Sequence, residues 1–177
     1  MFIQSLNLVK IELGYEAFHA VILGNEQGRD LYKKKLMQLT EQYHLTNQIK
    51  FIDHCKDMAL AYKISDIVIS PSIEPEAFGR VAVEAQSMEK LIIASNIGGS
   101  NETIIDGKTG LLFEAGDPNS LSKRIIQAVT LDESSYKRMG KEGRKNIAKK
   151  FNVEKMCFST YSEYKLSLIH ISEPTRR

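Results

Sequence analysis

Two glutamates stand eight positions apart in the stretch of this sequence that is best suited to chemistry. Glu76 and Glu84 flank the segment 77–80, which reads Ala-Phe-Gly-Arg. A glycine there lets the backbone approach a ligand closely, and the free N–H groups at the start of a helix attract anions. A carboxylate can accept hydrogen bonds from the vicinal hydroxyls of a ribose or a sugar ring. The spacing predicts a site for an anion such as a diphosphate, attached to a group that bears hydroxyls.

The two glutamates are not expected to share one face of a helix. The helical pattern spans 78–88, so Glu76 lies before it and Glu84 lies one to two turns inside it. The apolar run 66–70 just upstream predicts a strand. Open α/β sheets bind ligands at the carboxyl ends of their strands, so the whole motif is predicted to lie at such an edge.

Short apolar runs alternate with amphipathic stretches along the rest of the chain. The predicted strands are 18–23, 49–52, 66–70, 91–94 and 110–113, and the predicted helices are 2–13, 29–45, 57–64, 78–88, one from 118 onward, 133–149 and 152–165. This alternation indicates an α/β fold, a Rossmann-like doubly wound parallel sheet. Such a domain normally begins with its central strand, whereas this chain opens in a helix. We therefore expect a sheet without its first central strand, in which the strands at 18–23 and 66–70 are either separated by a gap or paired directly.

Composition excludes several classes of protein. The chain has 177 residues, 42% of them hydrophobic, which suffices for one packed core. A net charge of +2, from 24 Lys and Arg against 22 Asp and Glu, gives no electrostatic reason to expect a nucleic-acid partner. No apolar run approaches the roughly 18–20 residues that span a bilayer. Cys55 and Cys157 have no CxxC or Cys/His spacing, which excludes a zinc ribbon and favours a reducing, cytoplasmic compartment.

The motif resembles one that is found in the nucleotide-sugar-binding C-terminal half of GT-B glycosyltransferases, in the large family four of retaining enzymes. That family has a Glu-x7-Glu motif around Phe-Gly, which residues 76–84 match. The pair Gly98-Gly99 with Glu102, and the segment 106–113, match the family's next two landmarks. The resemblance covers about residues 2–165.

The resemblance implies a role for each matching residue. Glu76 would be the catalytic residue and would hydrogen-bond the hydroxyls of the donor sugar. Backbone N–H groups near Phe78, Gly79 and Arg80 would cradle the sugar and phosphate, and Glu84 would bind the ribose hydroxyls.

Five further residues complete the implied donor site. Ala77 belongs to the same backbone segment, and Gly98 and Gly99 would border the donor from the next loop. The backbone around Asp53 and His54 would border the nucleobase.

The implied activity is transfer of a glycosyl group, of the hexosyl type, from a nucleotide sugar with retention at the anomeric carbon. No cofactor or metal is implied; the nucleotide sugar is the donor substrate. The acceptor, which would be a glycan, a lipid or a small molecule, would bind the N-terminal domain. That domain, the first strand and the Arg and Lys after it are absent, so the chain is expected to be an inactive fragment. The implied location is cytoplasmic, with peripheral attachment to the inner membrane face in the full-length form as an alternative.

Simpler or different interpretations remain open. Glu84 pairs with Arg80 at i, i+4 in the simplest one, Glu76 merely favours the positive end of a helix, and Gly98-Gly99 is only a turn. A stand-alone nucleotide-sugar-binding module without catalysis is the main functional alternative. A nucleotide-sugar epimerase is a third, although such enzymes generally lack Phe-Gly inside a Glu-x7-Glu.

The end of the chain is expected to lie outside the domain. Residues 1–165 are predicted to form the nucleotide-sugar-binding domain. Residues 166–177 resemble a translated sequencing adaptor and are predicted to be a non-native tail that packs poorly.

Overall fold

The computed structural model describes residues 1–24, 30–53 and 55–172. Within these ranges the strands are parallel and form two sheets. In one sheet β1 pairs with β2, and in the other the order is β3-β4-β5. The strands are β1 (Ala20–Leu23), β2 (Ile49–Ile52), β3 (Ile67–Ser70), β4 (Leu91–Ser95) and β5 (Leu111–Phe113). Each coincides with a predicted strand to within two residues at either end.

The sequence left open whether β1 and β3 are separated by a gap or pair directly, and the structure has the gap. In the part of the chain that the structure describes, β1 and β3 are not hydrogen-bonded to each other. The order β2-β1, then β3-β4-β5, is the doubly wound order without its first strand. The α/β fold with parallel strands is confirmed.

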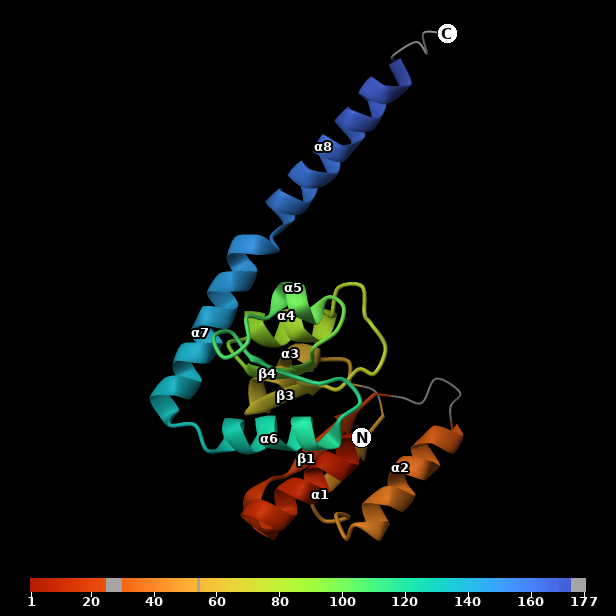
Figure 1. Ribbon diagram of the computed structural model, residues 1–177, viewed down its shortest axis with the longest axis vertical. Helices are drawn as coiled ribbons and strands as arrows, with labels where there is room; N and C mark the ends of the chain where they lie inside the picture. The colour runs from red at the N-terminus through yellow and green to blue at the C-terminus, as the bar shows by residue number, and fades with distance from the viewer. Residues whose placement is uncertain (25–29, 54, 173–177) are drawn as a thin grey trace.

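Helices cover both faces of the strands. They are α1 (Phe2–Leu13), α2 (Asp30–Gln42), α3 (Met58–Ile64), α4 (Arg80–Ser87), α5 (Ser100–Thr103), α6 (Pro118–Val129), α7 (Glu133–Lys150) and α8 (Val153–Ser172), with a 3-10 turn, η1 (Tyr15–Ala17). Figure 1 shows α1 and α6 on one side of β3 and β4, and α3, α4 and α5 on the other. Helix α5 and η1 were not predicted from the sequence, because a single helical turn is too short to show a periodicity.

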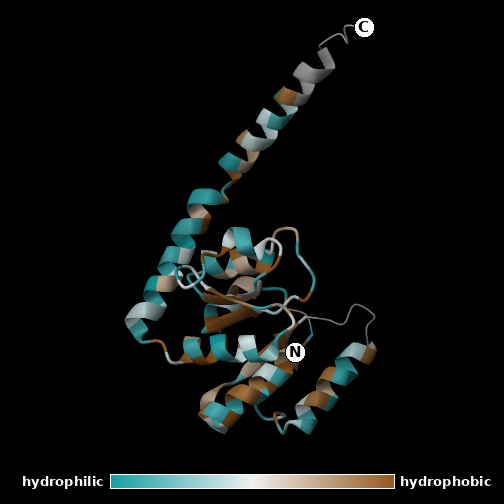
Figure 2. Ribbon diagram, viewed as in Figure 1, coloured by the Kyte–Doolittle hydropathy of each residue, from teal (hydrophilic) through white to brown (hydrophobic). Residues whose placement is uncertain are grey.

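Strand β4 lies at the centre of the core. All five of its residues are buried, and alternate side chains point to opposite faces. Leu91 and Ile93 belong to a cluster with α1 and α6, whereas Ile92 and Ala94 belong to a second cluster with α3 and α4. Figure 2 shows β3 and β4 largely in the hydrophobic colour, as expected for strands that are covered on both faces.

Helix α8 projects away from the rest of the molecule (Figure 1). It begins near the predicted residue but continues to Ser172, two residues before Pro174, rather than ending at Lys165. Leu166, the first residue of the predicted tail, has 55% of its surface exposed. None of the helices in the described ranges combines the length and the apolar character needed to cross a membrane.

Candidate functional site

The segment 71–79 leads from the carboxyl end of β3 into α4. Gly79 is the N-cap of α4 and has a φ of 69°, in the left-handed region that glycine adopts without steric cost. The helix therefore begins at Arg80, two residues later than predicted. Glu76 lies before the helix and Glu84 lies inside it, which confirms their predicted arrangement.

Both carboxylate oxygens of Glu84 accept hydrogen bonds. The hydroxyl of Tyr62, on α3, donates to Oε2 at 2.8 Å, and a guanidinium nitrogen of Arg80 donates to Oε1 at 3.2 Å. The pair with Arg80 is the simple i, i+4 interaction that the sequence allowed. Because the Arg80 side chain is 84% exposed, this pair contributes little to stability.

Tyr62 was not among the residues that the sequence analysis singled out. It occupies an apolar position of its helix, and only 6% of its surface is exposed. A buried phenol almost always finds a hydrogen-bond partner, which is the one signal that could have suggested a polar contact. Burial raises the pKa of Tyr62, and the hydrogen bond to Glu84 and the charge of Glu84 raise it further. The hydroxyl therefore remains a donor at neutral pH.

Glu76 is fixed through its backbone and exposes its side chain. Its carbonyl oxygen accepts a hydrogen bond of 2.8 Å from the N–H of Gly99, in the loop that follows β4. Its carboxylate is exposed and accepts a hydrogen bond from the hydroxyl of Ser72. The loops after β3 and β4 thus lie against each other.

Gly98 and Gly99, in the loop after β4, permit this contact between the two loops. A Cβ atom on Gly98 would lie 2.5 Å from the carbonyl oxygen of Glu76, and one on Gly99 would lie 2.5 Å from the carbonyl carbon of Phe78. Gly98 also has a φ of 56°. Gly98-Gly99 is therefore more than a turn, because close packing against the Glu76 loop demands glycine at both positions.

A row of backbone donors lies at the start of α4. Among the described residues, none accepts a hydrogen bond from the N–H groups of residues 77–81. Free N–H groups at a helix start carry partial positive charge and form a ready place for an anion. Ala77, Phe78, Gly79 and Arg80, all predicted site residues, supply most of this row.

Phe78 also connects the site to a distant helix end. Its ring contacts that of Phe151, just after α7, with centroids 5.5 Å apart and planes 70° from parallel. Such an edge-to-face pair holds the two segments together. Phe78 itself stays partly exposed, at 43% of its surface.

The predicted base-binding residues are described only in part. Asp53 follows β2, and its side chain, 68% exposed, pairs with Lys33 of α2. Among the described residues, neither a hydrogen bond nor an ion pair joins Asp53 to Glu76 or Glu84. His54 lies outside the described residues.

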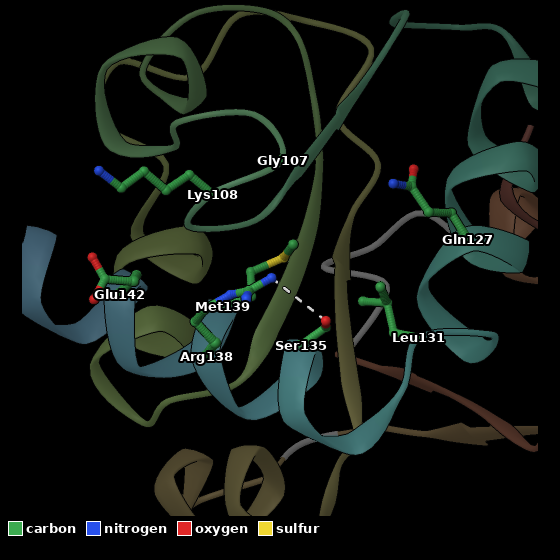
Figure 3. Close-up of a pocket in the computed structure, with 8 residues that line it drawn as sticks. All are labelled: Gly107, Lys108, Gln127, Leu131, Ser135, Arg138, Met139 and Glu142. Carbon is green, nitrogen blue, oxygen red and sulfur yellow. Dashed lines mark hydrogen bonds between the residues drawn. The ribbon is translucent and has the colours of Figure 1, made fainter.

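A cavity of about 380 Å³ lies elsewhere, between the loop before β5, the end of α6 and the start of α7 (Figure 3). Its lining residues are Gly107, Lys108, Gln127, Leu131, Ser135, Arg138, Met139 and Glu142. It contains none of the predicted site residues and lies where β5 begins, not where the strands end. In the described ranges, no three His, Cys, Asp or Glu side chains could together hold a metal ion. The candidate site is therefore the pair of loops after β3 and β4.

Comparison with known proteins gives consistent matches. A family model described as glycosyl transferases group 1 matches residues 1–146. CapM, a capsular polysaccharide biosynthesis glycosyltransferase from Staphylococcus aureus, is 29% identical over 150 residues, which cover 85% of this chain and 38% of CapM.

Solved structures share the fold. A glycosyltransferase from Rickettsia africae superposes with a TM-score of 0.86 and is 31% identical; the match covers 94% of this chain and 43% of that one. HepE from Anabaena, solved in complex with UDP-glucose, has a TM-score of 0.83 and 25% identity, over 93% of this chain and 44% of its own. The chain thus spans less than half the length of these relatives.

Proposed function

This chain belongs to the glycosyl transferases group 1 family, and from that premise we propose that it is the donor-binding part of an enzyme that transfers a glycosyl group from a nucleotide sugar with retention of configuration. The observation that supports this most directly is the row of free N–H groups at 77–81, flanked by Glu76 and Glu84. HepE, which shares the fold, binds UDP-glucose. The donor site proposed here consists of the loops after β3 and β4.

In this proposal each part of the site meets one part of the donor. The N–H groups at the start of α4 receive the diphosphate, whose negative charge grows as the bond to the anomeric carbon breaks. Glu84 accepts from the ribose hydroxyls and Glu76 accepts from hydroxyls of the sugar. Gly98 and Gly99 keep the Glu76 loop in place, and Asp53 and His54 border the base.

Transfer requires an acceptor as well as a donor. A hydroxyl of the acceptor, which would be a glycan, a lipid or a small molecule, forms the new bond at the anomeric carbon and loses its proton, and the nucleoside diphosphate leaves. We assign acceptor binding to the part of the longer relatives that this chain does not match, so this chain by itself is proposed to bind donor without turnover.

We also propose that no metal cofactor takes part. The unpaired cysteines favour a cytoplasmic site of action, with peripheral attachment to the inner membrane face as the alternative for the longer protein.

Calorimetry on the glutamate variants tests the proposal. Glu84→Ala removes charge-assisted hydrogen bonds worth about 1.5–3 kcal/mol and should weaken UDP binding roughly ten- to a hundredfold. Glu76→Ala should bind UDP as the wild type does, yet bind UDP-glucose more weakly and, in a full-length enzyme, lower turnover, because its partner is the transferred sugar.

Glu133→Ala is the matched control. It removes an i, i+4 ion pair with Lys137 on α7, similar in kind to the pair between Glu84 and Arg80, and should leave binding unchanged. Wild-type affinity in Glu84→Ala would show that Glu84 is only a partner of Arg80. If the wild type binds none of UDP, GDP and ADP, the proposal that this chain binds a nucleotide is wrong.

A further inference from the structure

The carboxylate of Glu84 is held unequally by its two partners. Tyr62 holds Oε2 at 2.8 Å, from a side chain that is almost wholly buried. Arg80 reaches Oε1 at 3.2 Å from a side chain that is 84% exposed. The contact with Tyr62 is therefore the rigid one, whereas the contact with Arg80 lies in solvent and is easily exchanged.

Tyr62 is rigid because its ring and its backbone are both fixed. The ring belongs to the cluster that includes Ala82 and Ala85 of α4 and Ile92 of β4. The carbonyl oxygen of Tyr62 accepts two hydrogen bonds from Ser65, one from its backbone N–H at 3.2 Å and one from the Ser65 hydroxyl at 2.8 Å. The phenolic hydroxyl is thus a donor at a fixed point beneath α4.

We propose that Tyr62 is a positioning residue for the nucleotide site: its hydroxyl orients the carboxylate of Glu84 so that the remaining acceptor positions face the two ribose hydroxyls. A carboxylate has about four acceptor positions, of which Tyr62 takes one and Arg80 takes another. At least one position on each oxygen is therefore left, which matches two vicinal hydroxyls. The inference rests on the proposed function and adds to it a residue outside the Glu-x7-Glu motif.

Orientation in advance reduces the cost of binding. A free glutamate side chain loses rotamer freedom when it engages a ligand, whereas one already held by Tyr62 has lost it on folding. Removal of the hydroxyl should therefore weaken binding of a ribose-containing ligand about two- to tenfold. It should not weaken the binding of a ligand that makes no hydrogen bond to Glu84.

The test is calorimetry of the whole chain with two ligands, UDP and 2′,3′-dideoxy-UDP. Tyr62→Phe keeps the ring and removes the hydroxyl. Its affinity for UDP should fall about two- to tenfold, whereas its affinity for the dideoxy ligand should be the same as that of the wild type. Tyr136→Phe is the control, because the hydroxyl of Tyr136 also makes one hydrogen bond, to the carbonyl of Asp66 at 2.7 Å, away from the site. It should bind both ligands as the wild type does. Thermal unfolding without ligand verifies that both variants are folded.

A double-mutant cycle supplies a second readout. In a Glu84→Ala background, Tyr62→Phe should cause no further loss of UDP affinity, because Tyr62 affects the ligand only through the carboxylate of Glu84. Equal losses for UDP and the dideoxy ligand, no loss for UDP, or additive losses in the cycle would each overturn the inference. Failure of the wild type to bind UDP, GDP or ADP would instead overturn the proposed function, and the inference with it.

Discussion

Gly98 and Gly99 shape the candidate site although neither has a side chain. A Cβ on either would come within 2.5 Å of the backbone of the segment that contains Glu76 and Phe78. Real Cβ atoms do not approach backbone so closely, so a substitution must push the two loops apart. The position of Glu76 is thus decided by residues that lie more than twenty positions further along the chain.

Gly98→Ala should therefore cost more than the same change at a glycine with open surroundings. Gly107 is the matched control, since its φ of 73° is also left-handed but nothing lies within 4 Å of its Cβ position. Gly107→Ala should lower the free energy of unfolding by about 1–2 kcal/mol through backbone strain alone. Gly98→Ala should lower it by a further ~1–3 kcal/mol because the new methyl group overpacks the contact between the loops. Urea unfolding measures both. Equal losses would mean that the loops adjust freely around the new methyl group.

The start of α7 depends on Asp132, the N-cap of that helix. Its Oδ1 accepts a hydrogen bond of 2.9 Å from the N–H of Ser135 and one of 2.6 Å from the hydroxyl of Ser134. These bonds to the ionised form, the hydroxyl of Ser134 first, hold the pKa of Asp132 well below its usual value. Helix α7 in turn packs closely against α4 and the residues after it, because Gly143 faces the side chain of Gln86 and Gly140 faces the backbone of Glu89.

This lowered pKa predicts a loss of stability in acid. The native carboxyl titrates below the unfolded one, whose pKa is about 3.9, so the contribution of Asp132 is present above that pH and is lost as the pH falls toward the lower native value. Asp132→Asn keeps an acceptor oxygen but does not titrate. Urea unfolding from pH 6 to pH 2 should show a shallower decline for the variant than for the wild type. Parallel curves would exclude Asp132 as a source of the acid sensitivity.

The whole molecule consists of a packed α/β body and a projecting α8. The large hydrophobic side chains between residues 153 and 166 of α8 are exposed, for example Val153 at 71%, Phe158 at 72% and Tyr164 at 68%. Leu166 is also exposed, so the first residue of the predicted tail adds little apolar burial. The stability of the body is therefore expected to reside in the two clusters on either side of β4.

Truncation after Lys165 should leave the body intact. We expect its free energy of unfolding to change by no more than about 0.5 kcal/mol, as for other changes away from packed contacts. Leu91→Ala, in the centre of the core, should instead lose about 2–5 kcal/mol. Thermal and urea unfolding of both variants measure the difference. A large loss on truncation would show that residues 166–177 belong to the domain.

Local patterns in the sequence were enough to predict the strands, the parallel α/β class and the arrangement of Glu76 and Glu84 around the start of a helix. Apolar runs and i, i+4 spacings reflect contacts between near neighbours, and these survive in the folded chain, as the pair of Arg80 with Glu84 illustrates. The place of the missing strand beside β1 was also predictable, since strand order in doubly wound sheets follows from chain order. That β1 and β3 do not pair directly there was decided by the folded chain.

Contacts between distant segments could not be predicted in this way. The hydroxyl of Tyr62 meets Glu84 only because α3 and α4 pack on the same face of β4, and Gly98 meets Glu76 only because two loops converge at the ends of neighbouring strands. No local periodicity encodes either meeting. Such contacts arise when the core closes and side chains far apart in sequence compete for the same space. The distant partners of the two glutamates therefore became known only from the folded arrangement of the chain.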